Sequence, residues 1–411
     1  MCGWLLVVIG LALDAACREG APRADGKVRL RLSGYAGNPA ETDLMRELVA
    51  DFNASQREIV VRYEPVPGQY YPKLLTMLAS RTAPDVFYLD ILYFQPFLAK
   101  RSILRPLDDF LASASTRTGD FVPALIAAFS DKGKVYGIPK DFNTLGLYYN
   151  RKSFDRAGLA YPTDRWDLAR FREAAERLTR PQGPAPRSGF AMPPDNADRF
   201  LPIAAMFGAT LYAPDGACAI ASPQGVQALT YYAALRRTDR SAIFPSEVGA
   251  SWTGDAFGRA QAAMVFEGSW LTPYLEESFP RLDYGLTQLP RGPAGRSNFL
   301  FTVAYVIPQS AKHPEAAWKL IAYLTNEASQ ERITFALPSR KAVSERFVAK
   351  HPEYRAILSA AAYARPYAFG PRGNRVNDRL GLAVQEVLLG VKPPKQALDD
   401  AAAAIDRINR L

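Results

Sequence analysis

Several side chains that could bind a ligand lie at the ends of predicted strands. Ser269 and Trp270 come just after the apolar run 263–266, which Glu267 ends, and Asp90 ends a second apolar run. In open α/β sheets ligands bind beyond the carboxyl ends of the strands, so these residues are expected to face a cleft. Aromatic rings pack on the apolar faces of ligands, and carboxylates accept strong hydrogen bonds from hydroxyls. Alternatively, Glu267 caps a turn and Asp90 caps the following helix.

Two further loops are predicted at the same edge of the sheet. Tyr35 follows the strand 28–32, and Gln69 and Tyr70 begin a helix after the strand 59–63. Strands that alternate with helices of ~10–15 residues indicate βαβ units and a mainly parallel sheet. The fold class predicted from this pattern is α/β.

The composition is that of a globular protein large enough for two domains or three. The chain has 411 residues, of which 48% are hydrophobic and 22% charged. Trp318 lies among apolar residues of a predicted helix and Trp166 directly precedes another, so both are predicted as core residues. The net charge of +9 is dispersed, with no run of five like charges, and we therefore expect no nucleic-acid partner.

Motifs of enzymes and metal sites are absent from the sequence. It contains no GxSxG, HExxH, GxxxxGK[ST] or GxGxxG motif. The two histidines, His313 and His351, are isolated, and no cysteines have metal-ligand spacing. We expect no catalytic residues, no metal and no cofactor. A glycosidase needs only two facing carboxylates, so Asp90, Asp141 and Glu267 keep that alternative open.

The first residues resemble a bacterial lipoprotein signal. A ten-residue apolar run, 4–13, precedes Ala15, Ala16 and Cys17, and no later apolar run reaches ~18 residues. The resemblance implies a signal peptide over residues 1–17 and lipid attachment at Cys17. Asp14 departs from the lipobox pattern, and a plain cleaved signal is the alternative. Either case predicts an extracytoplasmic protein, periplasmic or at the cell surface.

Six segments, taken together and in order, resemble the extracellular solute-binding proteins of ABC sugar importers, the maltose-binding-protein-like family. They are PDVFYLD (84–90), KVYGIP (134–139), LYYN (147–150), FGRAQAAMVFEGSW (257–270), YVIP (305–308) and HPEAAWKL (313–320). The resemblance implies a two-lobed periplasmic-binding-protein-like fold, in which each lobe has a central β-sheet flanked by helices. Crossing hinge segments would join an N-lobe, 28–140 and 302–345, to a C-lobe, 141–301 and 346–411.

The same resemblance extends the candidate site. Asp141 and Asn143 fall at the first implied crossing, Phe299 falls near the second, and Arg340 matches a position where family members use arginine. Trp252, before a predicted helix, is a second candidate for stacking. The implied ligand is a small-molecule sugar or oligosaccharide, and the implied partners are membrane permease subunits of an ABC transporter. We expect a monomer that binds its ligand without turnover.

Similar two-lobed proteins bind polyamines, iron, phosphate or peptides, so a non-sugar ligand is the main alternative. Polyamine sites need several convergent carboxylates around aromatic rings, and iron sites use pairs of tyrosines. Tyr148 and Tyr149 are adjacent on a predicted strand, where successive side chains point to opposite faces. They therefore cannot chelate one ion together. The mixture of aromatic, carboxamide and carboxylate candidates favours a sugar.

Overall fold

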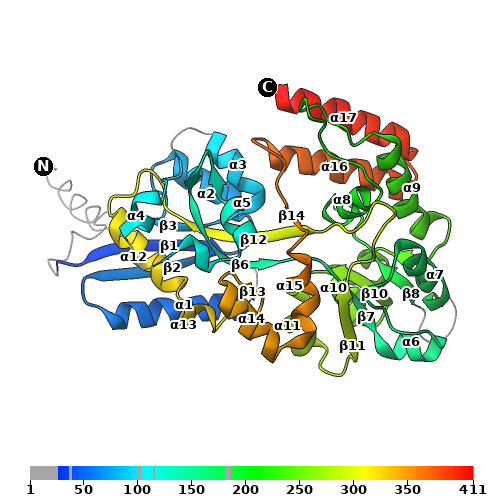
Figure 1. The fold of residues 1–411 in the computed structure, drawn as a ribbon, viewed down its shortest axis with the longest axis horizontal. Coiled ribbons are helices and arrows are strands. Elements are labelled where there is room, and N and C mark those ends of the chain that lie inside the picture. Colours follow the sequence, from blue (N-terminus) through cyan, green and yellow to red (C-terminus); the bar gives the residue numbers. More distant parts are fainter. Residues whose placement is uncertain are drawn as a thin grey trace, which may run out of the picture.

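The computed structural model describes residues 26–36, 39–99, 103–113, 116–180, 187–195 and 197–410. The predicted signal segment and Cys17 lie outside these residues. The described chain forms two α/β lobes side by side along the long axis of the molecule, each built on its own sheet (Figure 1). This arrangement confirms the predicted fold class. None of the described helices is both long and apolar enough to cross a membrane.

The N-lobe contains a seven-stranded mixed sheet. Its strand order is β13–β6–β12–β3–β1–β2, with β14 paired to β12. β1 runs parallel to β2 and β3, as the βαβ pattern predicts, whereas β12 is antiparallel to β3 and β6. The strands are β1 (Val28–Tyr35), β2 (Ile59–Val66), β3 (Val86–Asp90), β6 (Gly137–Asn143), β12 (Phe299–Val306), β13 (Leu337–Pro338) and β14 (Arg365–Pro366).

Helices cover both faces of this sheet (Figure 1). The first helix buries Met45, Leu48, Val49 and Phe52, which recur at the spacing of one helical face. Trp318 is buried with them in the core, as predicted. The elements are α1 (Pro39–Ser55), α2 (Tyr70–Ala79), α3 (Ile91–Ala99), α4 (Asp108–Ser113), α5 (Pro123–Ala128), α12 (Pro314–Leu324), α13 (Glu327–Gln330) and α14 (Lys341–Lys350), with the short helix η1 (Thr118–Asp120) and the hairpin β4 (Ser130–Asp131) and β5 (Lys134–Val135).

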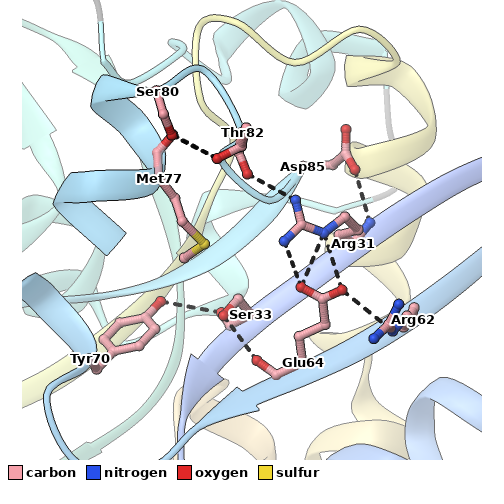
Figure 2. A network of polar contacts seen from close by, with 9 residues as sticks. All are labelled: Arg31, Ser33, Arg62, Glu64, Tyr70, Met77, Ser80, Thr82 and Asp85. Atoms are coloured by element: carbon pink, nitrogen blue, oxygen red, sulfur yellow. Dashed lines mark hydrogen bonds and ion pairs between the residues drawn. The ribbon is translucent and has the colours of Figure 1, made fainter. Parts of the chain in front are cut away.

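A polar network ties β1 to β2 and to the loop before β3 (Figure 2). The Arg31 side chain donates to both carboxylate oxygens of Glu64 and, through Nη1, to the carbonyl oxygen of Thr82 at 2.8 Å. The backbone N–H of Arg31 donates to Asp85 at 2.8 Å. These bonds hold the loop against the sheet and so fix where β3 begins, the strand that ends at Asp90.

The C-lobe contains a five-stranded sheet in the order β11–β7–β10–β8–β9. β10 is antiparallel to β7 and parallel to β8. The predicted core residue Trp166 is buried in this lobe. The strands are β7 (Gly146–Asn150), β8 (Ser188–Ala191), β9 (Ala242–Ile243), β10 (Ala262–Glu267) and β11 (Tyr284–Gln288); the helices are α6 (Arg151–Ala157), α7 (Leu168–Leu178), α8 (Ala197–Met206), α9 (Pro223–Arg237), η2 (Pro245–Val248), α10 (Thr253–Gly258), α11 (Leu271–Ser278), η3 (Pro352–Tyr354), α15 (Arg355–Ala360), α16 (Gly373–Leu388) and α17 (Pro394–Arg410).

Three stretches of chain run between the lobes. Asn298 lies in the second of them and forms hydrogen bonds to the first and the third. The stretches are 144–145, between β6 and β7; 289–298, between β11 and β12; and 351–372, between α14 and α16. The Asn298 side chain accepts from the backbone N–H of Leu145 at 2.9 Å and donates to its carbonyl oxygen at 2.7 Å. The Asn298 carbonyl oxygen accepts from the N–H of Arg365 at 3.0 Å. The connections between the lobes are therefore fastened together at one buried residue.

Candidate functional site

A cavity of about 500 Å³ lies between the lobes, and we call it the interlobe cavity. Its volume is within the range of small-molecule sites. Side chains from both lobes form its wall, which includes Tyr35 and four other aromatic residues. The lining residues are Tyr35, Pro39, Ala40, Glu41, Asp141, Asn143, Phe335 and Ala336 from the N-lobe, and Trp252, Trp270, Pro273, Tyr274 and Glu277 from the C-lobe.

A second cavity of about 390 Å³, the C-lobe cavity, adjoins the first. Trp252 and Trp270 line both cavities, so the two indole rings stand between them. The other lining residues are Pro193, Pro194, Asp195, Arg199, Pro245, Ser246, Ala250, Ser251, Thr253 and Glu267. Together the cavities form an extended space with two tryptophan rings at its centre.

Trp270 lies at the turn between β10 and α11, where the sequence predicts it. Its ring is half-buried and packs edge-on against Phe301 of β12, with centroids 5.7 Å apart. The indole Nε1–H donates to Glu267 at 2.9 Å, which fixes the ring orientation. Phe301 and Glu267 therefore hold the Trp270 ring in place, and the ring lines both cavities.

Glu267 is a buried positioning residue, 1% exposed. Besides Trp270, its carboxylate accepts from Arg199 Nη2 at 2.6 Å and from the hydroxyl of Thr253. Arg199 also pairs with Asp198. Burial lowers the pKa of Arg199, but the negative charges of Asp198 and Glu267 outweigh burial and raise it above the ordinary value. Both Glu267 oxygens are engaged within the protein, so the direct effect of Glu267 is to hold Trp270 in place.

Two glycines make room for the two tryptophan rings. A Cβ on Gly268 would overlap the Trp270 ring, and a Cβ on Gly254 would overlap the Trp252 ring. Trp252 in turn packs edge-on against Tyr274, with centroids 5.1 Å apart. Any larger residue at these glycines would displace the rings from their present positions.

Asn143 and Ser269 join the lobes directly beside Trp270. The Asn143 Oδ1 atom accepts from the backbone N–H of Ser269 at 3.0 Å and from its hydroxyl. Ser269 is fully buried, whereas Asn143 is 8% exposed and lines the interlobe cavity. The structure therefore brings together these two residues, predicted as ligand contacts, but it uses Ser269 as a connection between β6 and the turn before α11.

A buried charge cluster forms the N-lobe wall of the interlobe cavity. Lys140 Nζ donates to Glu41 at 2.7 Å and to the carboxylate of Asp141. Burial lowers the pKa of Lys140, but Asp141 and Glu41 raise it above its ordinary value. Burial also raises the pKa of Glu41, an effect that Lys140 opposes. Glu41 and Asp141 both line the cavity, so the cluster presents carboxylates to it.

Asp90 ends β3 and caps α3, which is the alternative that the sequence leaves open. Its Oδ1 atom accepts from the N–H of Leu92 at 2.8 Å. Asp90 and Asp141 both pair with Val303 of β12, from opposite sides, so the two carboxylates lie two strands apart on one face. Burial raises the pKa of Asp90 to about 6, and the negative charge of Asp141 adds to this shift.

Three further predicted site residues, Gln69, Tyr70 and Phe299, line neither cavity. Tyr70 is 3% exposed, and its hydroxyl donates to the carbonyl oxygens of Tyr88 and Ser33, so it is a core residue (Figure 2 shows its bond to Ser33). Gln69 is exposed at the start of α2. Phe299 packs among the rings of Tyr367, Phe369 and Phe301.

Arg340 also lies outside the lining of both cavities. It is buried in the N-lobe, where its guanidinium donates to the carbonyl oxygen of Thr325 and to Asp120 and lies 4.8 Å from the Phe121 ring centroid. These contacts fasten the start of α14 to the short helix η1. The family resemblance implies a ligand contact for Arg340, whereas in the structure its partners hold it within the N-lobe and it lines neither cavity.

The residues at the site that the sequence predictions do not name include Glu41, Lys140, Arg199 and Tyr274. A signal for two of them exists, because Lys140 and Asp141 interrupt the apolar pattern of a fully buried strand. Buried charges need partners, so an acidic partner for Lys140 could have been inferred. Tyr274 follows Trp270 by one helical turn, a spacing that places both on one side of α11.

The arrangement is suited to binding a ligand. The three carboxylates considered for a glycosidase are engaged: Asp90 with the N-terminus of α3, Asp141 with Lys140, and Glu267 with Arg199. Within the described residues, no group of three or more His, Cys, Asp or Glu side chains is arranged to hold a metal ion. What the cavities offer is ring faces and fixed hydrogen-bonding groups from two lobes.

Comparison with known proteins places this geometry among binding proteins. The family model described as bacterial extracellular solute-binding protein matches residues 36–331. A putative binding protein of Brucella abortus (strain 2308) is 23% identical over 390 residues, 93% of each chain. The galactooligosaccharide-binding protein of Bacillus subtilis (strain 168) is 25% identical over 66% of this chain and 65% of its own. The structure of an ABC substrate-binding protein from Listeria monocytogenes in complex with cycloalternan has a TM-score of 0.85 and 22% identity, over 94% of this chain and all of that one.

Proposed function

This chain belongs to the family of bacterial extracellular solute-binding proteins, and from that premise we propose that it captures a sugar or oligosaccharide for an ABC transporter. The observation that carries the proposal is the interlobe cavity, where tryptophan rings from one lobe face fixed polar side chains from the other. Rings bind the C–H faces of sugars, and carboxylates and carboxamides bind the hydroxyls. The sugar-binding relatives support the same ligand class.

The proposed mechanism is capture by closure of the two lobes. A sugar entering the cavity stacks on Trp270 and Trp252 and bonds to Asp141 and Asn143. Because such a guest contacts both lobes, it favours the closed form and shifts the population toward it. The stretches fastened by Asn298 supply the hinge. The predicted lobe limits, 28–140 with 302–345 and 141–301 with 346–411, stay a prediction.

The closed protein would then dock on the permease subunits of the transporter, whose ATPase drives import. We propose that the chain acts as a monomer outside the cytoplasm, held to the membrane by lipid on Cys17. The extracellular family supports this location. A lipoprotein of Streptomyces antibioticus, 30% identical over 43% of this chain, supports the anchor.

A panel of mono- and oligosaccharides, screened by calorimetry and thermal shift, tests the proposal. Incubation of the same sugars followed by product analysis tests the enzymatic alternative, since release of products would overturn capture without turnover. Polyamines, ferric iron and short peptides belong in the panel as alternative solutes. Preferential binding of one of these would replace the sugar as the ligand.

The Trp270→Ala variant is expected to bind the selected sugar about 10- to 100-fold more weakly, which corresponds to ~1.4–2.8 kcal/mol. The reason is loss of the ring on which the sugar stacks. Trp270→Phe, which retains a ring, should recover part of the affinity, and Tyr161→Ala, at an exposed position on the C-lobe, serves as the control. Unchanged affinity in Trp270→Ala would remove Trp270 from the site.

A further inference from the structure

The walls of the two cavities are acidic although the whole chain is basic. The net charge of the chain is +9. Among the described residues that line the cavities, Glu41, Asp141, Asp195, Glu267 and Glu277 carry carboxylates, and Arg199 alone carries a cation. The cavity, its rings and the family identify this as the binding site; the carboxylates bear on which guest it selects.

The cationic side chains at the site form ion pairs with carboxylates of the protein itself. Lys140 is held by Glu41 and Asp141, and its side chain is 3% exposed. Arg199 is held by Asp198 and Glu267, and its side chain is 6% exposed. Each cluster has two carboxylates and one cation, which leaves one net negative charge. Ionised carboxylates only accept hydrogen bonds, so the walls favour a guest rich in donors.

The rings of the cavity already stabilise positive charge from within the protein. Lys140 Nζ lies 5.0 Å from the centroid of the Phe335 ring, and the guanidinium carbon of Arg199 lies 5.9 Å from the Trp270 ring centroid. Both rings also line the interlobe cavity. Aromatic faces attract cations through the ring quadrupole, and carboxylates strengthen that attraction.

We propose that the preferred guest carries a protonated amine, which makes it an amine-bearing sugar if the proposed sugar-binding function holds. The ammonium group lies between Glu41 and Asp141 on the N-lobe wall and Glu277 on the C-lobe wall. It offers three donors and no acceptor, which matches walls that accept. Carboxylates from the two lobes repel each other across an empty cavity, and a cation between them attracts both, so this guest also favours closure.

Matched sugars that differ only in the substituent on carbon 2 of each sugar unit test the inference. Glucosamine, glucose and N-acetylglucosamine, together with the corresponding galactose series and the disaccharides chitobiose, cellobiose and diacetylchitobiose, are titrated by calorimetry at low ionic strength. The amine is expected to bind at least about 10-fold more tightly than its hydroxyl and acetamide counterparts. That advantage should shrink as salt is added, because ions screen the carboxylates.

Glu277→Gln is expected to reduce the preference for the amine several-fold without affecting folding, because Glu277 is exposed. Glu276→Gln removes the same charge from the neighbouring exposed position, which does not line the cavity, and should leave the preference unchanged. Asp141→Asn provides a second variant on the opposite wall. Equal effects of the Glu276 and Glu277 variants would contradict a local role.

The possible outcomes separate this inference from the proposed function. If the neutral sugars bind as tightly as the amines, the inference is overturned and sugar capture stands. If putrescine binds more tightly than any sugar, the proposed function is overturned while the preference for a protonated amine stands. If no sugar and no amine binds, both fail.

Discussion

At the scale of single residues, the site depends on side chains that orient the ligand-facing groups. Glu267 is nearly inaccessible, yet it holds Trp270 through the indole Nε1–H and is itself held by Arg199. A buried ion pair contributes little net stability when intact, but breaking one partner leaves an uncompensated buried charge. The Glu267 carboxylate therefore affects both the position of the Trp270 ring and the stability of the folded protein.

Glu267→Gln is expected to lower the free energy of unfolding by about 3 kcal/mol and to weaken ligand binding. The reason is that Arg199 would keep only Asp198 as a negative partner. The matched control is Glu247→Gln, whose pair with Arg236 is at the surface and should contribute below ~1 kcal/mol. Denaturant unfolding measures both, and equal losses would show that burial of the Glu267 cluster is unimportant.

Asp90 provides a residue-scale prediction for pH. Burial raises the pKa of Asp90 from 3.8 to about 6, so between these values the folded protein binds a proton that the unfolded chain has lost. The stabilisation from this proton is fully present below about pH 4 and is lost as the pH rises to about 6. It amounts to no more than ~3 kcal/mol, since Asp90 keeps some solvent exposure.

The Asp90→Asn variant can retain the cap on α3 through its side-chain oxygen but cannot ionise. Its stability relative to the wild type should therefore rise between about pH 4 and pH 6 and then stay constant. Urea unfolding across this range measures the difference. A difference that does not vary with pH would show that Asp90 has its ordinary pKa in the folded protein.

At the scale of elements, the decisive feature is how strands connect the lobes. β6 and β12 are neighbours in the N-lobe sheet, and both are continuous with the stretches that lead to the C-lobe. Asn298, at the end of the stretch before β12, bonds to Leu145, in the stretch after β6, through both the oxygen and the nitrogen of its carboxamide. The proposed closure of the lobes would therefore turn about this bonded point rather than about independent linkers.

Asn298→Ala is expected to lower stability by about 1–3 kcal/mol and to change the extent of lobe closure. A matched control exists within the N-lobe: Asn53 makes the same pair of bonds to the backbone of Val61, at 2.8 and 2.9 Å. Asn53→Ala should cost similar stability but leave closure unaltered. Small-angle X-ray scattering with and without bound sugar measures closure, and identical behaviour of the two variants would exclude a hinge role for Asn298.

At the scale of the whole molecule, the proposed function requires both a mobile pair of lobes and attachment near the permease. The three stretches join the two lobes, and the first described strand, β1, begins at the end of the N-lobe that is far from the C-lobe (Figure 1). An anchor at Cys17 would thus hold the protein by the N-lobe side without involving the cavity.

Cys17→Ser is expected to move the protein from the membrane fraction to the soluble extracytoplasmic fraction while leaving sugar affinity unchanged. Only a cysteine thiol can receive the lipid, and Cys17 precedes the first described strand, β1, in the sequence. Fractionation followed by immunoblotting measures the distribution. A wild-type protein that is already soluble would favour the alternative of a plain cleaved signal.

Local features of the sequence determined the elements and several positions at their ends. The alternation of strands and helices predicts the parallel part of the N-lobe sheet, and the apolar run before Glu267 predicts that Trp270 follows a strand. The neighbours of Trp318 along its helix identify it as a core residue. These inferences succeed because periodicity and strand ends depend on residues close together in the chain.

The tertiary structure alone decided which polar residues lie together at the cavities and which are buried in the interior of a lobe. Lys140 meets Glu41 across 99 positions, and Ser269 meets Asn143 across 126. Tyr70 and Arg340 have the residue types of ligand contacts, but their partners come from distant segments and bury them. Such convergence is set by the packing of sheets and crossing stretches, because the free energy of burying a polar group depends on partners that local sequence does not contain.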